Sequence, residues 1–152
     1  MSMIFLSHEQ VSLVTEILDQ LIPNGDGFPG AGELGIAQHI DEAAGNEPKL
    51  RRLFLDGFNS IDITSFEMYS SGFSDLVSQQ KIEVLKEVES RKSTFFKELV
   101  KHTYAGYYTN RNVIELLGLE ARPPQPLGFE LEPFDPSLLE NVKKRGKMYR
   151  DA

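Results

Sequence analysis

Hydrophobic residues recur at helical spacing along the first two thirds of the chain. Between positions 11 and 22 they fall every three or four residues, which places them on one face of a helix. Ser7 precedes this stretch and Gln10 follows three residues later, the pattern of a capping box at a helix start. Residues 23–30 are rich in proline, glycine and asparagine, so we predict that they form a loop that ends this helix.

Four further stretches have the same periodicity. They predict helices over residues 32–44, 48–69, 79–90 and 93–108. Asn46 and Ser93 are the expected N-caps, residues 70–72 end the third helix, and Phe73 and Leu76 are predicted to anchor the next connection to the core. No stretch before Asn110 alternates with the period of two that marks a half-buried strand. We therefore predict an all-α fold, a compact bundle of about five helices over residues 5–109.

Residues 110–152 are predicted to form an extended, proline-rich C-terminal arm. Five of the eight prolines lie between positions 123 and 136, where they disfavour helix, with short helices expected only at 113–117 and from Ser137. An extended segment with apolar anchors can lie along a neighbouring protein, and its basic end adds charge pairing. The alternative is that the arm packs on its own helices. Tyr107 and Tyr108 lie about 100° apart on a helix, so one of them is expected to face outward. The predicted partner-binding residues are Tyr107, Tyr108, Pro124, Leu127, Phe129, Phe134, Leu138, Arg145 and Tyr149.

The negative charge of the chain excludes some classes of binding partner. The net charge is -7, and all of it lies in residues 1–109, which hold 9 basic and 16 acidic side chains. An acidic protein repels nucleic acid and anionic lipid, so neither is expected as a partner. The absence of cysteine excludes disulfides, thiolate-held clusters and a cysteine nucleophile. No window approaches the roughly 20 apolar residues of a membrane span, and no signal peptide is evident. The expected location is cytoplasmic, or periplasmic if a leader was removed or a partner supplies one.

Two motifs suggest chemistry at first sight. Residues 30–35, Gly-Ala-Gly-Glu-Leu-Gly, match the dinucleotide-binding pattern but follow a predicted helix and loop instead of a strand, so we interpret them as a tight loop that enters a helix. None of His8, His39 and His102 has a second histidine four residues away, as a helical zinc site requires. His8 is expected to be solvated and His39 to share an exposed face with Asp41 and Glu42, whereas His102 is expected in the core or an interface.

These residues support no assignment of a catalytic, cofactor or metal site. Two alternatives stay open at this point: a free-standing helical adaptor, and a small helical hydrolase or lyase that uses His102 with a nearby carboxylate.

Three segments nonetheless follow one another in the order of a known family. The first runs from Leu6-Ser7 and Glu9-Gln10 to Leu21-Ile22-Pro23, Pro29-Gly30-Ala31, Glu33, Gly35 and Ile40-Asp41. The second is Phe73-Ser74-Asp75-Leu76 with Gln79-Gln80, and the third is Phe95-Phe96, Glu98-Leu99, His102-Thr103 and Gly106. In this succession the chain resembles the gluconate 2-dehydrogenase subunit 3 family.

The resemblance implies a non-catalytic small subunit that binds and chaperones a large flavoprotein of the glucose–methanol–choline type. FAD is then expected on that partner and no cofactor on this chain. The partner would oxidise a sugar, a sugar acid or a glycoside, and a cytochrome accepts the electrons in many such complexes. The family role in export depends on a twin-arginine signal, which this sequence lacks.

Overall fold

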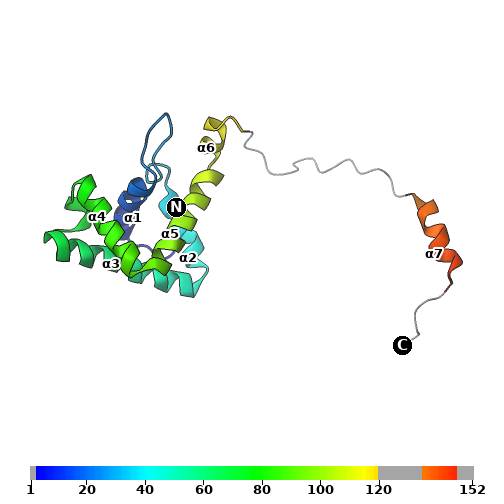
Figure 1. Ribbon diagram of the computed structural model, residues 1–152, viewed down its shortest axis with the longest axis horizontal. Helices are drawn as coiled ribbons and strands as arrows, with labels where there is room; N and C mark the ends of the chain where they lie inside the picture. The colour runs from blue at the N-terminus through cyan, green and yellow to red at the C-terminus, as the bar shows by residue number, and fades with distance from the viewer. Residues whose placement is uncertain (1–2, 120–134, 147–152) are drawn as a thin grey trace. The chain divides into compact units, whose positions relative to one another are not determined.

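The computed structural model describes residues 3–119 and 135–146, and every regular element within them is helical (Figure 1). The elements are α1 His8–Leu21, α2 Ile36–Gly45, α3 Pro48–Tyr69, η1 Phe73–Asp75, α4 Ser78–Arg91, α5 Ser93–Thr109, α6 Arg111–Leu116, η2 Pro136–Leu139 and α7 Glu140–Lys144. The described residues contain no strand, only an isolated bridge between Gly25 and Phe28. The all-α prediction is confirmed.

Helix α1 begins where the capping box predicts. The Ser7 hydroxyl accepts the Gln10 N–H at 3.2 Å, and the Gln10 side chain accepts the Ser7 N–H at 2.9 Å. Leu13, Val14, Ile17 and Leu18 form the buried face of the helix. The loop that follows Ile22 turns back, and its Ala31 N–H donates to the Ile22 carbonyl at 3.0 Å. This loop therefore stays close to the end of α1.

The start of α2 differs from the prediction. It begins at Ile36 and not near residue 32, because Gly35 has φ +70, a left-handed conformation that a helix cannot include. The prediction for Asp41 was also wrong: it is 1% exposed, and its carboxylate accepts the N–H groups of Ile4 at 2.5 Å, Phe5 at 3.0 Å and Leu6 at 2.9 Å. Asp41 thus fixes the N-terminal segment on α2.

Two predicted caps are wrong as well. Glu47 occupies the N-cap of α3 without a side-chain bond, whereas the Asn46 amide donates to the Glu42 carbonyl at 2.9 Å. Lys92 occupies the N-cap of α5, so Ser93 is already helical. The predicted end of α3 is confirmed, because Ser70 is left-handed there at φ 55. Phe73 and Leu76 are buried, as predicted for anchors.

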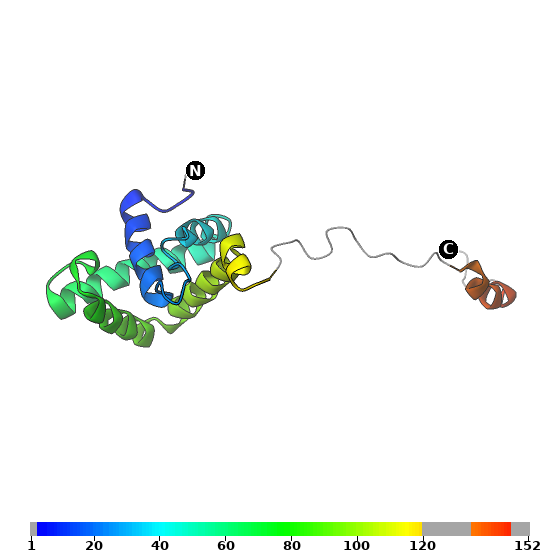
Figure 2. The same cartoon turned by 90° about the horizontal axis from the view of Figure 1, so that it is seen from above.

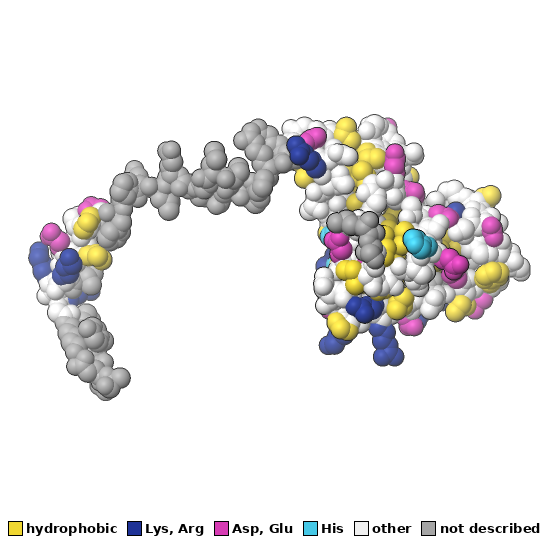
Figure 3. Space-filling view, turned by 180° about the vertical axis from the view of Figure 1, so that it is seen from behind, with side chains coloured by type: hydrophobic (Ala, Val, Ile, Leu, Met, Phe, Trp, Pro, Cys, Tyr) yellow, Lys and Arg dark blue, Asp and Glu magenta, His cyan; other side chains and the backbone are white. Residues whose placement is uncertain are grey.

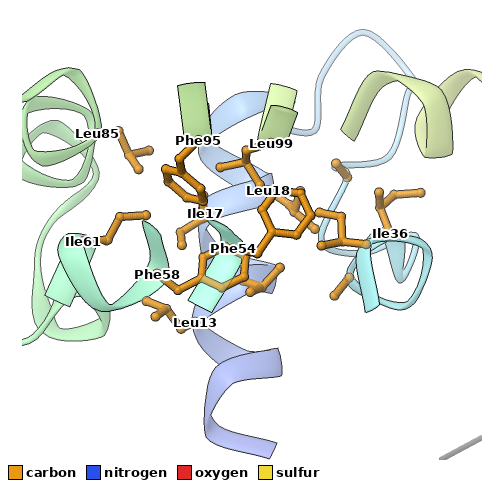
Figure 4. Close-up of a cluster of buried hydrophobic side chains, with 14 of the residues drawn as sticks. Leu13, Ile17, Leu18, Ile36, Phe54, Phe58, Ile61, Leu85, Phe95 and Leu99 are labelled. Carbon is orange, nitrogen blue, oxygen red and sulfur yellow. The ribbon is translucent and has the colours of Figure 1, made fainter. Parts of the chain in front are cut away.

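Helices α1, α3 and α5 meet in a core that is rich in aromatic side chains (Figure 4). Phe54 and Phe58 of α3 are fully buried, and the Phe95 ring of α5 lies edge-on to both, with centroid distances of 6.1 and 5.6 Å. Gly57 makes this possible: a Cβ atom at that position would overlap the Phe95 ring. The approach of α3 and α5 therefore depends on a glycine in the middle of a helix.

The compact body continues beyond residue 109, where α6 follows directly on the end of α5 (Figure 2). Val113 of α6 is 0% exposed and belongs to the same core, and Gly118, with φ +75, follows the end of that helix. The chain divides into two units, Met1–Ala121 and Arg122–Ala152. Within the second, η2 leads directly into α7, and the Asp135 carboxylate accepts the Ser137 N–H at 2.9 Å. None of the helices in the described part of the chain is long and apolar enough to cross a membrane.

Candidate partner interface

The two tyrosines predicted to contact a partner have opposite environments. Tyr107 is 3% exposed, and its hydroxyl donates to the Pro29 carbonyl at 2.9 Å, which connects α5 to the loop after α1. Burial raises the pKa of the Tyr107 hydroxyl, so it remains protonated and able to donate. Tyr108 is 53% exposed. Of this pair, only Tyr108 is available to another protein at the surface of the described chain.

Tyr108 has an aromatic neighbour that is not among the predicted partner-binding residues. The ring of Tyr104, one turn earlier on α5, is 46% exposed and stacks on Tyr108 with centroids 5.9 Å apart and planes 12° apart. The buried Tyr107 ring meets the Tyr108 ring edge-on, with centroids 5.3 Å apart, and so helps to fix the position of Tyr108. The signal for Tyr104 was the four-residue spacing, which puts both rings on one helix face.

Helix α6 and the residues after it add further apolar side chains at the surface. Leu116, Leu117 and Leu119 are 52, 45 and 62% exposed, while Val113 attaches α6 to the core. We refer to Tyr104, Tyr108, Leu116, Leu117 and Leu119 as the α5–α6 apolar surface. Figure 3 shows one face of the molecule, on which hydrophobic side chains reach the surface among polar ones. Tyr104, Tyr108 and Leu116 stand on the consecutive helices α5 and α6, and their exposure makes this surface a candidate contact with another protein.

Most of the predicted contacts of the arm lie outside the described residues. They are Pro124, Leu127, Phe129, Phe134 and Tyr149, together with the side chain of Leu138. Arg145 is described and is exposed just after α7. The partner-binding role of these residues, and of Tyr107 and Tyr108, stays a prediction.

The glycine motif packs against a carboxylate. The Gly32 N–H donates to Asp19 Oδ1 at 2.8 Å, and a Cβ atom at Gly32 would lie 2.5 Å from the Thr15 carbonyl oxygen. The neighbouring hollow, about 270 Å³, is lined by the carboxylates of Asp19 and Glu33. A helix and a loop precede the motif, as the sequence predicted, whereas a dinucleotide-binding motif follows a strand. The two carboxylates would also repel the phosphates of a dinucleotide. Gly30 and Gly32 therefore allow the loop to pack closely on α1, whereas Gly35 provides the left-handed turn before α2.

The histidines give no metal site. Within the described ranges, no three His, Cys, Asp or Glu side chains are grouped so that they could hold an ion. The ring centroids of His39 and His102 lie 6.1 Å apart, and His102 meets Phe54 edge-on at 5.9 Å. Glu98 Oε2 is 3.7 Å from His102 Nε2, too far for a hydrogen bond. An enzyme that uses His102 would need a carboxylate hydrogen-bonded to it. Glu98 lies near His102 but makes no hydrogen bond to it.

The environment of His102 predicts how stability depends on pH. Burial lowers the pKa of His102 below its ordinary value of 6.5, and the charges of Lys101 and His39 lower it further. The carboxylates of Glu98 and Glu47 raise the pKa, but by less than the other effects lower it. Because protonation is disfavoured in the folded state, the stabilisation is present above pH 6.5 and is lost as the pH falls through the lowered pKa. The melting temperature of the wild type should fall between about pH 6.5 and 5, and this fall should be smaller in His102→Gln. The melting temperatures are measured by circular dichroism at several pH values. The exposed His8→Gln is the control, and equal slopes in both variants would contradict the prediction.

Comparison with protein families gives a match to gluconate 2-dehydrogenase subunit 3 over residues 8–119. The match includes most of the chain and every helix of the body. The chain belongs to the gluconate 2-dehydrogenase subunit 3 family. No curated protein and no solved structure matches it. The family match begins at α1 and ends just after α6, so it contains every residue of the α5–α6 apolar surface.

Family membership makes the chain a subunit of a dehydrogenase complex that has partner subunits. Within such a complex, exposed Tyr108 and its stacked neighbour Tyr104 are candidate contact residues. The predicted arm begins at residue 110, so its first ten residues lie inside the family match and residues 120–152 lie beyond it. The family match therefore supports the predicted body and α6, but not the rest of the predicted arm.

Proposed function

We propose that this chain is a non-catalytic small subunit that binds and stabilises the large, FAD-dependent subunit of a sugar, sugar-acid or glycoside dehydrogenase. The family match over residues 8–119 carries the proposal. A helical body that presents Tyr104, Tyr108 and three leucines to solvent also suits a subunit that is completed by another protein. The large subunit would hold the flavin and the substrate, and it would pass electrons to an acceptor such as a cytochrome.

A stabilising role has a simple thermodynamic basis. A protein that binds only the folded form of its partner shifts the folding equilibrium of that partner toward the native state. The same contact covers apolar surface that would otherwise favour aggregation of the large subunit. No group of this chain needs to touch substrate for that effect.

Co-expression tests the proposal. The tagged chain is produced together with a candidate large flavoprotein subunit from the same organism, and we expect a complex with flavin absorbance and dehydrogenase activity. The flavoprotein alone should give less soluble, flavin-loaded protein, and the isolated chain should be colourless and inactive. Flavin absorbance that travels with the isolated chain on gel filtration would contradict the proposal. So would a flavoprotein that is equally soluble and active without this chain.

A further inference from the structure

The second half of α3 carries an apolar pair at the surface, away from the α5–α6 apolar surface in the sequence. Ile63 is 59% exposed and Phe66 is 58% exposed. They are three residues apart, so they are neighbours on one face of the helix. Asp62 lies four residues before Phe66 and next to Ile63, and so shares this region of the surface. We call Asp62, Ile63 and Phe66 the α3 face.

Asp62 is unusual among the acidic residues of α3. Asp56 has Lys92 at 3.4 Å and Glu67 has Arg91 at 2.8 Å, whereas Asp62 has no ion pair or hydrogen bond to any side chain that the structure describes. The helix contains no lysine or arginine after Arg52. Asp62 is also half-buried, and this burial raises its pKa. A carboxylate that is partly removed from water without a cation destabilises the isolated chain.

The chemistry of the α3 face defines what can cover it. A purely apolar surface would bury Ile63 and Phe66 favourably but would leave the Asp62 carboxylate dry and unpaired, which is costly. A surface with a lysine or arginine between apolar side chains satisfies both requirements, because the cation pairs with the carboxylate while its stem and neighbours contact the rings and methyl groups. The acidic body of this chain favours such a partner over a second copy of itself, since its residues 1–109 hold 16 acidic and 9 basic side chains.

We propose that the α3 face is a docking site for the large dehydrogenase subunit, and that a basic side chain of that subunit, flanked by apolar residues, pairs with Asp62. This inference rests on the proposed function. It assigns to the complex a second contact region, on α3, in addition to the α5–α6 apolar surface.

A competition experiment in the intact complex tests it. Wild-type and variant full-length chains with different tags are co-expressed with one large subunit, and the ratio of the two in the purified complex is measured by mass spectrometry. We expect Asp62→Asn to lower the incorporation of the variant at least about tenfold, as for truncation of one member of a buried charge pair, and Asp62→Lys to lower it further. Phe66→Ser should also lose to the wild type.

Matched controls separate this contact from general effects. Glu89→Gln removes an exposed carboxylate on α4 that likewise has no partner among the described residues, and Met68→Ser removes an exposed apolar side chain from another side of α3. Both should enter the complex in equal ratio with the wild type. The melting temperature of isolated Asp62→Asn should equal or exceed that of the wild type, because an unpaired charge that is partly removed from water is lost.

Each alternative outcome is decisive. If the wild-type chain does not enter a complex, the proposed function fails and this inference fails with it. If it enters and Asp62→Asn enters equally well, only the inference is overturned. A loss of incorporation accompanied by an equal loss of thermal stability would also overturn it, because the residue would then be structural. The inference would also be overturned if the isolated chain is a dimer that Asp62→Asn or Phe66→Ser converts into a monomer without any change in incorporation. The α3 face would then be a contact between two copies of this chain.

Discussion

Replacing Gly57 by alanine is expected to lower the melting temperature of the chain, although alanine is the better helix former. In an exposed helix this change would stabilise the protein by up to about 1 kcal/mol. Here the new Cβ atom overlaps the Phe95 ring, which is itself fully buried and lies edge-on to Phe54 and Phe58. Because Phe95 is packed edge-on against two other buried rings, any shift of its ring disturbs those contacts, and overpacking by about 1 to 3 kcal/mol should exceed the gain in helix propensity. We expect a fall of roughly 5 °C in a thermal melt.

Two further variants make this prediction specific. Gly25→Ala is the control, since a Cβ atom there meets nothing within 4 Å; its melting temperature should stay close to that of the wild type. Combining Gly57→Ala with Phe95→Leu should cost less than the sum of the two single changes, because the smaller side chain makes room for the methyl group. A Gly57→Ala chain as stable as the wild type would show that α3 and α5 separate easily, contrary to their close packing around Phe95.

A chain that ends at Glu120 is expected to keep its fold and to lose its partner. The body has its own core, and Val113 of α6 is the last of its fully buried side chains in the described sequence. Removal of residues 121–152 should therefore leave the helical circular dichroism of the body and its cooperative melting. If the arm lies along the large subunit, as its apolar residues and prolines predict, the truncated chain should lose most of its co-purification with the flavoprotein.

The full-length chain co-expressed under the same conditions is the reference for this experiment. Undiminished recovery of the flavoprotein with the truncated chain would show that the arm is not needed for binding. Unfolding of the truncated chain would instead show that the arm belongs to the core of its own protein, the alternative that the sequence left open. Both results are visible in one preparation, because circular dichroism and co-purified flavin are measured on the same sample.

The candidate interface was predictable in part. The adjacent positions of Tyr107 and Tyr108 showed that one of them faces outward, but the helix phase that decides which one depends on the contact of Tyr107 with Pro29, a residue 78 positions earlier. Tyr104 could have been found from its spacing to Tyr108. Asp62 could not, because an acidic residue among apolar ones on a helix gives no sign of whether a cation from another helix will reach it.

The sequence by itself determined which stretches of this protein are helical, though not every helix boundary. Helical periodicity, the Ser7–Gln10 capping box, Pro48 at the start of α3 and the break at Ser70 are local, since each depends on residues within about one turn of each other. The order of motifs along the chain likewise indicated the family, because that order is a property of the sequence alone.

Only the tertiary structure decided which polar groups are buried and which helices approach closely. Asp41 looks like a surface residue in its helix, yet three N–H groups of the N-terminal segment, 35 to 37 residues away, supply the hydrogen bonds that make its burial favourable. Gly57 looks like a weak point in α3 until Phe95, from another helix, occupies the space that its missing side chain leaves. Both depend on contacts between distant parts of the chain, and local periodicity contains no information about such pairs.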